Sequence, residues 1–316
     1  MKLSTKTSSR TGGWIQRTPL TVARSHCAVA VVNDKIYVLG GGGPNFQSLD
    51  SSVVYDPKVD EWSDVSPMPT RRSGTVTAVI GGKIYVMAGG FKHPDGTFRF
   101  LNKVEIYDPE LDQWQDGPAL IMPHDYPAVA ELDGAVFVLG GHHPEAYLGG
   151  PKTDPGFDYC ERFDPVTGTW HPIAPLSQPR FALAAVTMGD RILAMGGVAF
   201  TPQGFNNFTL IEEYDAHQDR WTTRDNFVLP WPAAGLSAAI IGDKFCVFGG
   251  YSGDGIHNRA ARYDATSNRW TLLPSMPAPR AATGVAVIGE TVYLIGGWAD
   301  DGRTPQSTLF SYDFST

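Results

Sequence analysis

The chain has 316 residues, including 35 glycines, 24 prolines and three cysteines, and a formal net charge of −8. The negative charge and the lack of any run of Lys or Arg exclude nucleic acid as an expected partner, and no stretch of about 18 apolar residues is present that would span a membrane. The odd number of cysteines, spread along the chain, predicts reduced, buried thiols and a cytoplasmic location rather than a disulfide framework.

Residues 1–11 open the chain without the apolar segment of a secretory signal. We expect them to form a disordered leader before a single folded domain at 12–316. Within that domain, short apolar runs are separated by Gly, Pro, Asn and Asp, and no helical periodicity of useful length occurs. The pattern predicts an all-β domain.

From residue 27 onward, one pattern recurs six times with a period of about 50 residues. Each copy begins with two short apolar strands, and the second strand ends in small residues, at 36–41, 84–90, 136–141, 192–197, 245–250 and 292–297. An aromatic–Asp pair follows in every copy. In five copies a tryptophan stands seven positions after the aromatic residue: Trp62, Trp114, Trp170, Trp221 and Trp270.

The sixth aromatic–Asp pair, Tyr312-Asp313, has no tryptophan after it. The missing residue corresponds to Trp14, at the other end of the chain. A repeat divided between the two ends of a chain is typical of a ring that closes on itself. We therefore expect the strand around Trp14 to join the last repeat.

The Gly-Gly, the aromatic–Asp pair, the spaced tryptophan and a preceding Pro-Arg together resemble the Kelch repeat, over nearly the whole chain from Trp14 to Asp313. The resemblance implies a six-bladed β-propeller of four-stranded antiparallel blades, closed by the N-terminal strand, and it does not identify a subfamily. Since no adaptor domain accompanies the repeats, we expect a freestanding monomer. The sequence departs from the pattern at Ala88-Gly89, and the arginine position is occupied by His124 in the third repeat and by Ala233 in the fifth.

The recurring residues have structural roles that follow from their chemistry. The Asp after the aromatic residue can cap its own turn by binding backbone N–H groups. The tryptophan covers apolar area between blades, and its indole N–H needs a carbonyl partner. Function is therefore expected in the loops rather than in the blades.

We name the strands of a blade a to d in chain order. The b–c loops and the d–a loops open on the same face of the ring, and the b–c loops differ widely in length, with the longest at 142–158. We predict that this face binds the ligand. Apolar walls are expected from Phe91, Phe200, Trp231, Tyr251 and Trp298.

Blade 3 departs most from the repeat on this face. Its d–a loop contains His124, Asp125 and Tyr126, and its b–c loop begins with His142 and His143. The position of Tyr126 is occupied by His26 in the first repeat and by Gly or Ala in the other four: Gly74, Ala182, Gly235 and Ala282. Small residues at four positions leave a central space, into which Tyr126 and His26 are expected to project.

These residues support several interpretations. Tyr126, His26, Asp125, His124 and His142 could transfer protons as general acids and bases, or Tyr126 could only plug the funnel. Three repeat arginines (Arg72, Arg180 and Arg280) and His143 could hold a ligand, in which case the arginines clamp an anion, or the arginines could bond loop carbonyls. The histidines, with Asp125 or Glu145, could also hold a metal, although adjacent histidines often diverge; we expect no cofactor.

Three function classes follow. The main prediction is binding of a small or medium-sized molecule, or of a short peptide, in the funnel of b–c and d–a loops. The alternative is an isomerase or lyase that uses acid–base groups on the blade 1 and blade 3 side of this funnel, with or without a metal, because the resemblance extends to freestanding six-bladed Kelch proteins that work as isomerases. The third is a protein–protein interaction module, the role of many Kelch propellers.

Overall fold

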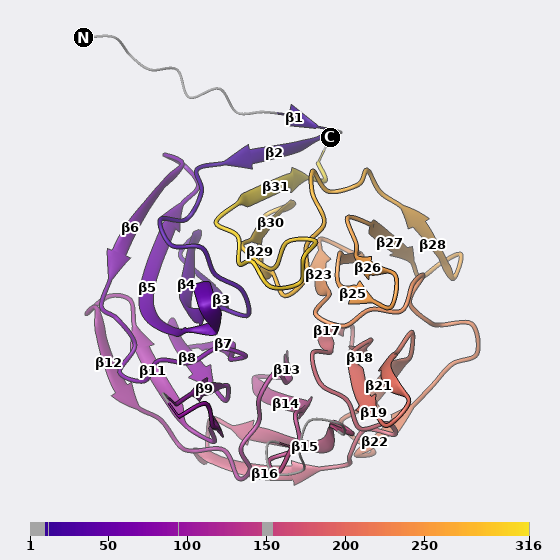
Figure 1. Cartoon of the computed structure of the whole chain (residues 1–316). Helices are drawn as coiled ribbons and strands as arrows, with labels where there is room; N and C mark the ends of the chain where they lie inside the picture. The colour runs from indigo at the N-terminus through magenta and orange to yellow at the C-terminus, as the bar shows by residue number, and fades with distance from the viewer. Residues whose placement is uncertain (1–9, 12, 94, 147–153, 316) are drawn as a thin grey trace.

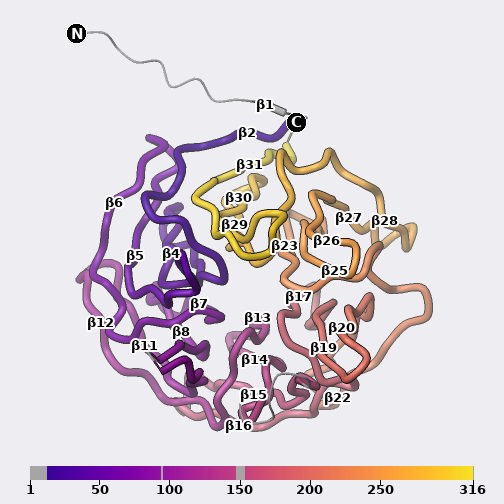
Figure 2. The backbone as a smooth tube through the Cα atoms, viewed as in Figure 1, coloured from indigo at the N-terminus to yellow at the C-terminus, as the bar shows by residue number. Residues whose placement is uncertain are grey.

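The computed structural model describes residues 10–11, 13–93, 95–146 and 154–315. Figure 1 shows six β-sheets arranged as blades around a central axis, each with four antiparallel strands, to which a short fifth strand is added in one sheet. The predicted all-β, six-bladed propeller is therefore confirmed. The path of the backbone in Figure 2 passes around the ring once, from blade 1 in indigo to blade 6 in yellow.

Each blade contains an a strand next to the axis and a d strand at the rim. Blade 1 consists of β3 (Ala28–Val32), β4 (Lys35–Gly42), β5 (Ser48–Asp56) and β6 (Glu61–Val65). Blade 2 consists of β7 (Val76–Ile80), β8 (Lys83–Met87), β11 (Val104–Asp108) and β12 (Gln113–Asp116). Blade 3 consists of β13 (Ala128–Leu132), β14 (Ala135–Gly141), β15 (Phe157–Asp164) and β16 (Thr169–Ile173). Blade 4 consists of β17 (Ala184–Met188), β18 (Arg191–Met195), β21 (Ile211–Asp215) and β22 (Arg220–Thr222). Blade 5 consists of β23 (Ser237–Ile241), β24 (Lys244–Phe248), β27 (Ala260–Asp264) and β28 (Arg269–Leu272). Blade 6 consists of β29 (Gly284–Ile288), β30 (Thr291–Ile295), β31 (Leu309–Asp313) and β2 (Trp14–Arg17).

Some b–c loops contain secondary structure of their own. A 3₁₀ turn, η1 (Pro44–Phe46), lies in the loop of blade 1. Blades 2, 4 and 5 carry two-stranded hairpins: β9 (Gly90–Lys92) with β10 (Phe98–Phe100), β19 (Val198–Thr201) with β20 (Gly204–Asn207), and β25 (Tyr251–Ser252) with β26 (Gly255–Ile256). These elements lie on the face on which the b–c loops open.

The outer strand of blade 6 comes from the start of the chain. Strand β2 pairs antiparallel with β31, with Trp14 opposite Tyr312 and Arg17 opposite Leu309. Of the predicted leader, residues 1–9 lie outside the described residues, and Arg10–Thr11 form a short strand, β1, that pairs with β2. The sheet of blade 6 therefore contains strands from both ends of the chain.

The repeated tryptophans and aspartates act as the sequence predicts. Each of six indole N–H groups, that of Trp14 included, donates to a backbone carbonyl of the preceding blade or of the segment after it, at 2.8 to 3.0 Å. Each Asp of an aromatic–Asp pair accepts the N–H two residues later, at 2.8 to 3.0 Å. The indole and carboxylate groups of the repeat are thus used by the scaffold.

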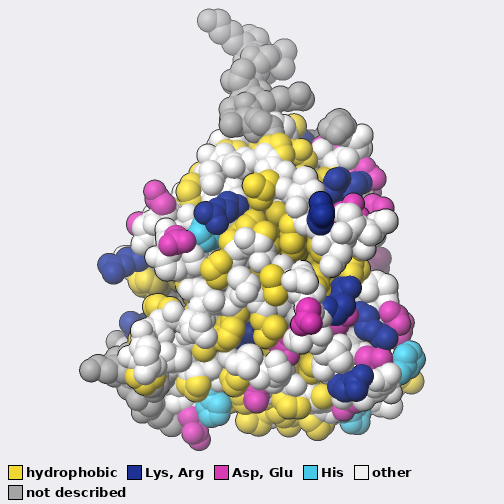
Figure 3. All heavy atoms as spheres, turned by 90° about the vertical axis from the view of Figure 1, so that its right-hand side faces the viewer, with side chains coloured by type: hydrophobic (Ala, Val, Ile, Leu, Met, Phe, Trp, Pro, Cys, Tyr) yellow, Lys and Arg dark blue, Asp and Glu magenta, His cyan; other side chains and the backbone are white. Residues whose placement is uncertain are grey.

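Apolar clusters fill the spaces between neighbouring blades. All three cysteines are free and buried, as predicted. On the outer wall in Figure 3, acidic and basic side chains are interspersed rather than gathered by sign. No helix in the described part of the chain is long and apolar enough to cross a bilayer.

Candidate functional site

The site begins with a ring of backbone hydrogen bonds around the propeller axis. Six residues, one from each d–a loop, each donate a backbone N–H to the carbonyl of the equivalent residue in the neighbouring blade, at 2.7 to 3.1 Å. All six have left-handed backbones, with φ between 49° and 65°. In order they are His26, Gly74, Tyr126, Ala182, Gly235 and Ala282.

This backbone conformation suits glycine and is unfavourable for bulky residues. A non-glycine residue held there costs about 1–2 kcal/mol. His26 and Tyr126 nevertheless occupy two of the six positions, and their rings meet edge to face with centroids 4.5 Å apart. Strain of this kind concentrates at functional sites, so these two positions are candidates for function.

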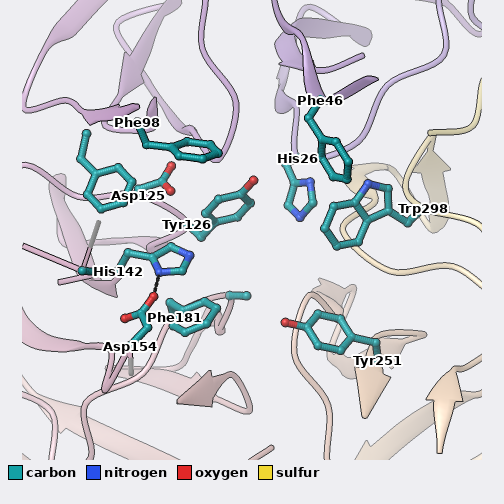
Figure 4. A pocket seen from close by; sticks show the side chains of 13 residues that line it. His26, Phe46, Phe98, Asp125, Tyr126, His142, Asp154, Phe181, Tyr251 and Trp298 are labelled. Carbon is teal, nitrogen blue, oxygen red and sulfur yellow. Dashed lines mark hydrogen bonds and ion pairs between the residues drawn. The ribbon is translucent and has the colours of Figure 1, made fainter. Parts of the chain in front are cut away.

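A cavity of about 360 Å³ lies above this ring, on the face with the b–c loops (Figure 4). Its walls come from three d–a loops and five b–c loops and are mostly aromatic. The lining residues are His26, Phe46, Phe98, Phe100, Asp125, Tyr126, His142, Ala146, Asp154, Phe181, Ala182, Tyr251 and Trp298. A largely apolar cavity with a few convergent polar groups is the usual form of a small-molecule site.

His142 is held in a fixed orientation at one side of the cavity. Its imidazole stacks on Phe181, with centroids 3.8 Å apart, and lies nearly parallel to Phe100 at 5.7 Å. Its Nδ1 hydrogen bonds to the carboxylate of Asp154, while the other ring nitrogen points toward the open space (Figure 4). A carboxylate at Nδ1 selects the tautomer and leaves Nε2 available to a ligand.

The charge state of the floor follows from burial. The side chain of Asp125 is 5% exposed, and burial, with the charge of Asp154 second, raises its pKa well above the usual range for a carboxyl. Burial also lowers the pKa of His26 to about 3, with His142 contributing. Burial thus favours the protonated form of the Asp125 carboxyl and keeps the imidazole of His26 neutral at neutral pH.

Two tyrosines in the cavity are held in their neutral form. Burial, together with Asp125, raises the pKa of Tyr126. Burial and the charge of Asp154 raise the pKa of Tyr251 to about 12. Both hydroxyls therefore keep their protons and can donate hydrogen bonds to a ligand.

A second hollow of about 530 Å³ adjoins the cavity and shares with it His142, Asp154, Phe181, Tyr251 and Trp298. We call this hollow the mouth. It adds apolar side chains from Phe200, Phe205 and Ile256, and polar ones from the loop of blade 6, Asp300 and Asp301. Phe200 packs against Phe205 with ring centroids 4.8 Å apart.

Comparison with known proteins agrees with this architecture. A family model described as the KLHDC2/KLHL20/DRC7 Kelch-repeats domain matches residues 3–197, more than half of the chain, and the Kelch motif matches 232–277 and 279–316. The chain belongs to the Kelch-repeat family.

This Kelch propeller is similar to several larger proteins. It is 26% identical over 272 residues to Kelch-like protein 36 of Mus musculus, covering 84% of this chain and 42% of that protein. It is 28% identical over 259 residues to Kelch-like protein terF of Aspergillus terreus, covering 76% and 52%, and 26% identical over 189 residues to Kelch repeat and BTB domain-containing protein 12 of Danio rerio, covering 56% and 30%. It thus spans between about a third and a half of these relatives.

The Kelch propeller also resembles a solved structure titled "Structure of YjhT". The TM-score is 0.78 at 18% sequence identity, over 93% of this chain and 96% of the other. At this identity the likeness establishes the shared fold.

The arginine positions of this Kelch propeller lie inside the blades, away from the cavity lining. Arg72 and Arg180 are fully buried and form ion pairs with Glu105 and Glu212. His124 takes the same place in blade 3, where its Nδ1 is 2.6 Å from the carbonyl of Gly140 and its Nε2 is 3.1 Å from Glu161. Because both nitrogens of His124 have internal partners, we leave it out of the proposed site.

Arg280 is likewise used within the scaffold. Its guanidinium donates to the carbonyl of Pro279 at 2.6 Å and to the hydroxyl of Thr308 at 3.1 Å. None of the three arginines named as ligand-binding candidates lines the cavity or its mouth. Their contacts in the structure fit the other interpretation of these arginines, in which they bond within the loops instead of clamping an anion.

Three further candidates lie beside the cavity rather than in its lining. The indole of Trp231 is buried and donates to the carbonyl of Gly249 at 3.0 Å. Phe91 packs against His93 with ring centroids 4.8 Å apart. His143 packs on Phe157 and accepts the backbone N–H of Glu145 through Nδ1. His142 and His143 thus point in different directions, as adjacent histidines in a loop often do.

Several lining residues were not singled out from the sequence. Phe181 directly follows the arginine position, in the slot that Asp125 occupies in blade 3, and this alignment could have identified it. Asp154 and the pair Phe98 and Phe100 lie within long loops of no repeat register, where the sequence alone offers no signal. Among the described residues, no group of three or more His, Cys, Asp or Glu side chains is arranged to hold a metal.

Proposed function

We propose that this Kelch propeller binds a small or medium-sized organic ligand in the cavity above its six-residue ring. The observation that carries the proposal is the convergence of His26, Tyr126 and His142. Tyr126 lies 4.5 Å from His26 and 5.4 Å from His142 between ring centroids, and all three line one cavity. His26 comes from a loop far in sequence from those of Tyr126 and His142, and His26 and Tyr126 have left-handed backbones.

The chemistry of the lining supports a ligand with a substantial apolar body. Phenylalanine, tyrosine and tryptophan rings form most of the wall, and their burial against a ligand is favourable at about 25 cal/mol per Å². The few polar groups, among them Asp125, His142 and Asp154, can fix the orientation of the ligand. The volume of the cavity lies within the range of known small-molecule sites, roughly 300–1,000 Å³.

The test is a fluorine NMR screen with a fragment mixture that contains neutral, cationic and anionic members. Ala146→Trp places an indole into the cavity from its loop. Val166→Trp adds the same side chain on an exposed turn, where Val166 is 92% exposed. We expect fragments to bind the wild-type protein and the Val166→Trp variant and to lose binding in Ala146→Trp. Equal binding to all three proteins, or no binding to the wild type, would contradict the proposal.

A second candidate function is proton transfer on the bound molecule, of isomerase or lyase type. The bond between His142 and Asp154 favours it, because it orients an imidazole whose free nitrogen faces the cavity. Asp125, whose pKa burial raises, is the candidate acid. The measurement is incorporation of deuterium from heavy water into fragments found by the screen. General acid–base catalysis contributes about 10²–10⁴-fold, and His142→Asn should lower the rate by that order while Val166→Trp leaves it unchanged.

A further inference from the structure

The rings and carboxyls of the site indicate what charge its ligand carries. Among the described residues that line the cavity and its mouth, the acidic side chains are Asp125, Asp154, Asp300 and Asp301, and none is Lys or Arg. We propose that the ligand is an organic cation, a molecule with a protonated or quaternary amine on an apolar or aromatic body. This inference rests on the proposed function and specifies the ligand class.

The aromatic wall is the first support. In Figure 4 the rings of Phe46, Phe98, Tyr126, Phe181, Tyr251 and Trp298 surround the open space. The face of such a ring attracts a cation within about 6 Å of its centroid, by about 0.5–1 kcal/mol at exposed sites and about 2 or more when the pair is shielded from water. A cation enclosed by several rings gains the sum of these contributions, whereas an anion gains little from the ring faces.

The charge balance of the polar groups is the second support. The pair of His142 and Asp154 brings a carboxylate to the side of the cavity. His26 adds no positive charge, because burial lowers its pKa to about 3. Asp125, which is 5% exposed and directed toward the space, has a pKa that burial raises well above its usual value, and a nearby cation would favour its ionised form.

An anionic ligand would meet the opposite conditions. A buried anion needs a cationic or hydrogen-bonding partner to offset the loss of hydration. Basic side chains next to lining residues include Lys92, whose amino group lies 5.5 Å from the ring of Phe98, and Arg303, beside Asp301. Both are exposed side chains outside the lining, so they offer an anion no contact inside the cavity.

The test compares three probes that share one shape and differ in charge. They are meta-hydroxyphenyltrimethylammonium, its uncharged isostere meta-tert-butylphenol, and the anion meta-hydroxybenzenesulfonate. Each is titrated into the protein below pH 7 and followed by calorimetry and by NMR of the probe. We expect the cation to bind at least about tenfold more tightly than the isostere, which corresponds to about 1.4 kcal/mol, and the sulfonate more weakly than either.

Two variants locate the preference. Phe181→Leu keeps apolar bulk but removes a ring face, and Asp154→Asn removes the charge. Both should reduce the tenfold preference for the cation severalfold, while the affinity for meta-tert-butylphenol changes less than twofold. Calorimetry in buffers of different ionisation enthalpy should also show more proton release on binding of the cation than on binding of the isostere, because the cation favours the ionised form of Asp125.

The outcomes separate the inference from the proposed function. If the isostere or the sulfonate binds as tightly as the cation, and Ala146→Trp abolishes that binding, the cavity is a ligand site and the inference of a cation is wrong. If the cation fails to bind while uncharged or anionic fragments occupy the cavity in the NMR screen, the inference also fails alone. If no probe and no fragment binds the wild type, both the inference and the proposed function fail.

Discussion

His124 and Tyr126 stand two residues apart in the same loop, and both depart from the repeat, yet they lie in different parts of the molecule. His124 occupies the slot of the repeat arginine, fully buried against Glu161. Tyr126 belongs to the six-residue ring and forms part of the cavity wall. Of these two departures from the repeat, only Tyr126 faces the cavity.

The backbone explains the difference. At position 126 a left-handed φ of 54° and the hydrogen bond to Gly74 hold the side chain at the axis. At position 124 the side chain lies between strands of its own blade, where Arg72 and Arg180 lie in blades 2 and 4. An arginine–carboxylate pair and a histidine–carboxylate pair thus fill equivalent places, and His124 is a variant of the scaffold.

The largest expected effect on stability comes from opening the circle of blades that carries Tyr126. Deletion of residues 1–17 removes β2 and with it Trp14, which is 1% exposed and packs between blades 5 and 6. Loss of a buried tryptophan side chain alone costs about 3–5 kcal/mol, so the thermal midpoint should fall by more than it does for Trp14→Ala. A midpoint unchanged by the deletion would show that β2 does not close the propeller.

The buried pairs of a basic side chain and a carboxylate give the next largest effect on stability. They test whether His124 has only a structural role. Glu212→Gln leaves the charge of Arg180 buried without its carboxylate, which should cost about 3–5 kcal/mol. Glu161→Gln should cost only about 1–2 kcal/mol, because the glutamine side chain can keep a hydrogen bond to His124 and no guanidinium charge is left buried without its partner. Urea unfolding of the two variants measures the difference. Neither change should alter fragment binding in the cavity, and a loss of binding in Glu161→Gln would return His124 to the site.

The fold was predictable from the sequence because each blade repeats the same chemistry. The indole N–H and the Asp of each copy satisfy local backbone groups, so their spacing alone encodes the blade. The unusual character of positions 26 and 126 was predictable for the same reason. His26 and Tyr126 stand where the other four copies have Gly or Ala. Asp154 was not predictable, because its position against His142 depends on the path of a loop that has no counterpart in other blades.

His26, in the six-residue ring, should also make the stability of the protein fall in acid. The pKa of His26 in the folded protein is about 3, below its usual value of about 6.5. The stability that this neutral imidazole maintains is complete above pH 6.5 and is lost as the pH falls toward 3, by at most about 1.4 kcal/mol per pH unit. His26→Asn, which tolerates the left-handed backbone, should flatten this part of the thermal midpoint against pH. Parallel curves for the two proteins would show that His26 does not contribute.

The smallest effect isolates the backbone strain of the ring from its side chains. Ala182 shares the left-handed conformation of Tyr126, with φ of 51°. Ala182→Gly should therefore raise stability by up to about 1 kcal/mol, since glycine adopts this backbone without steric cost. Tyr126→Gly relieves the same strain but removes a ring that packs on His26, so it should lose fragment binding even if its midpoint is unchanged. If Ala182→Gly is as destabilising as Tyr126→Gly, the ring backbone is not strained, and the bulky residues at positions 26 and 126 need no functional explanation.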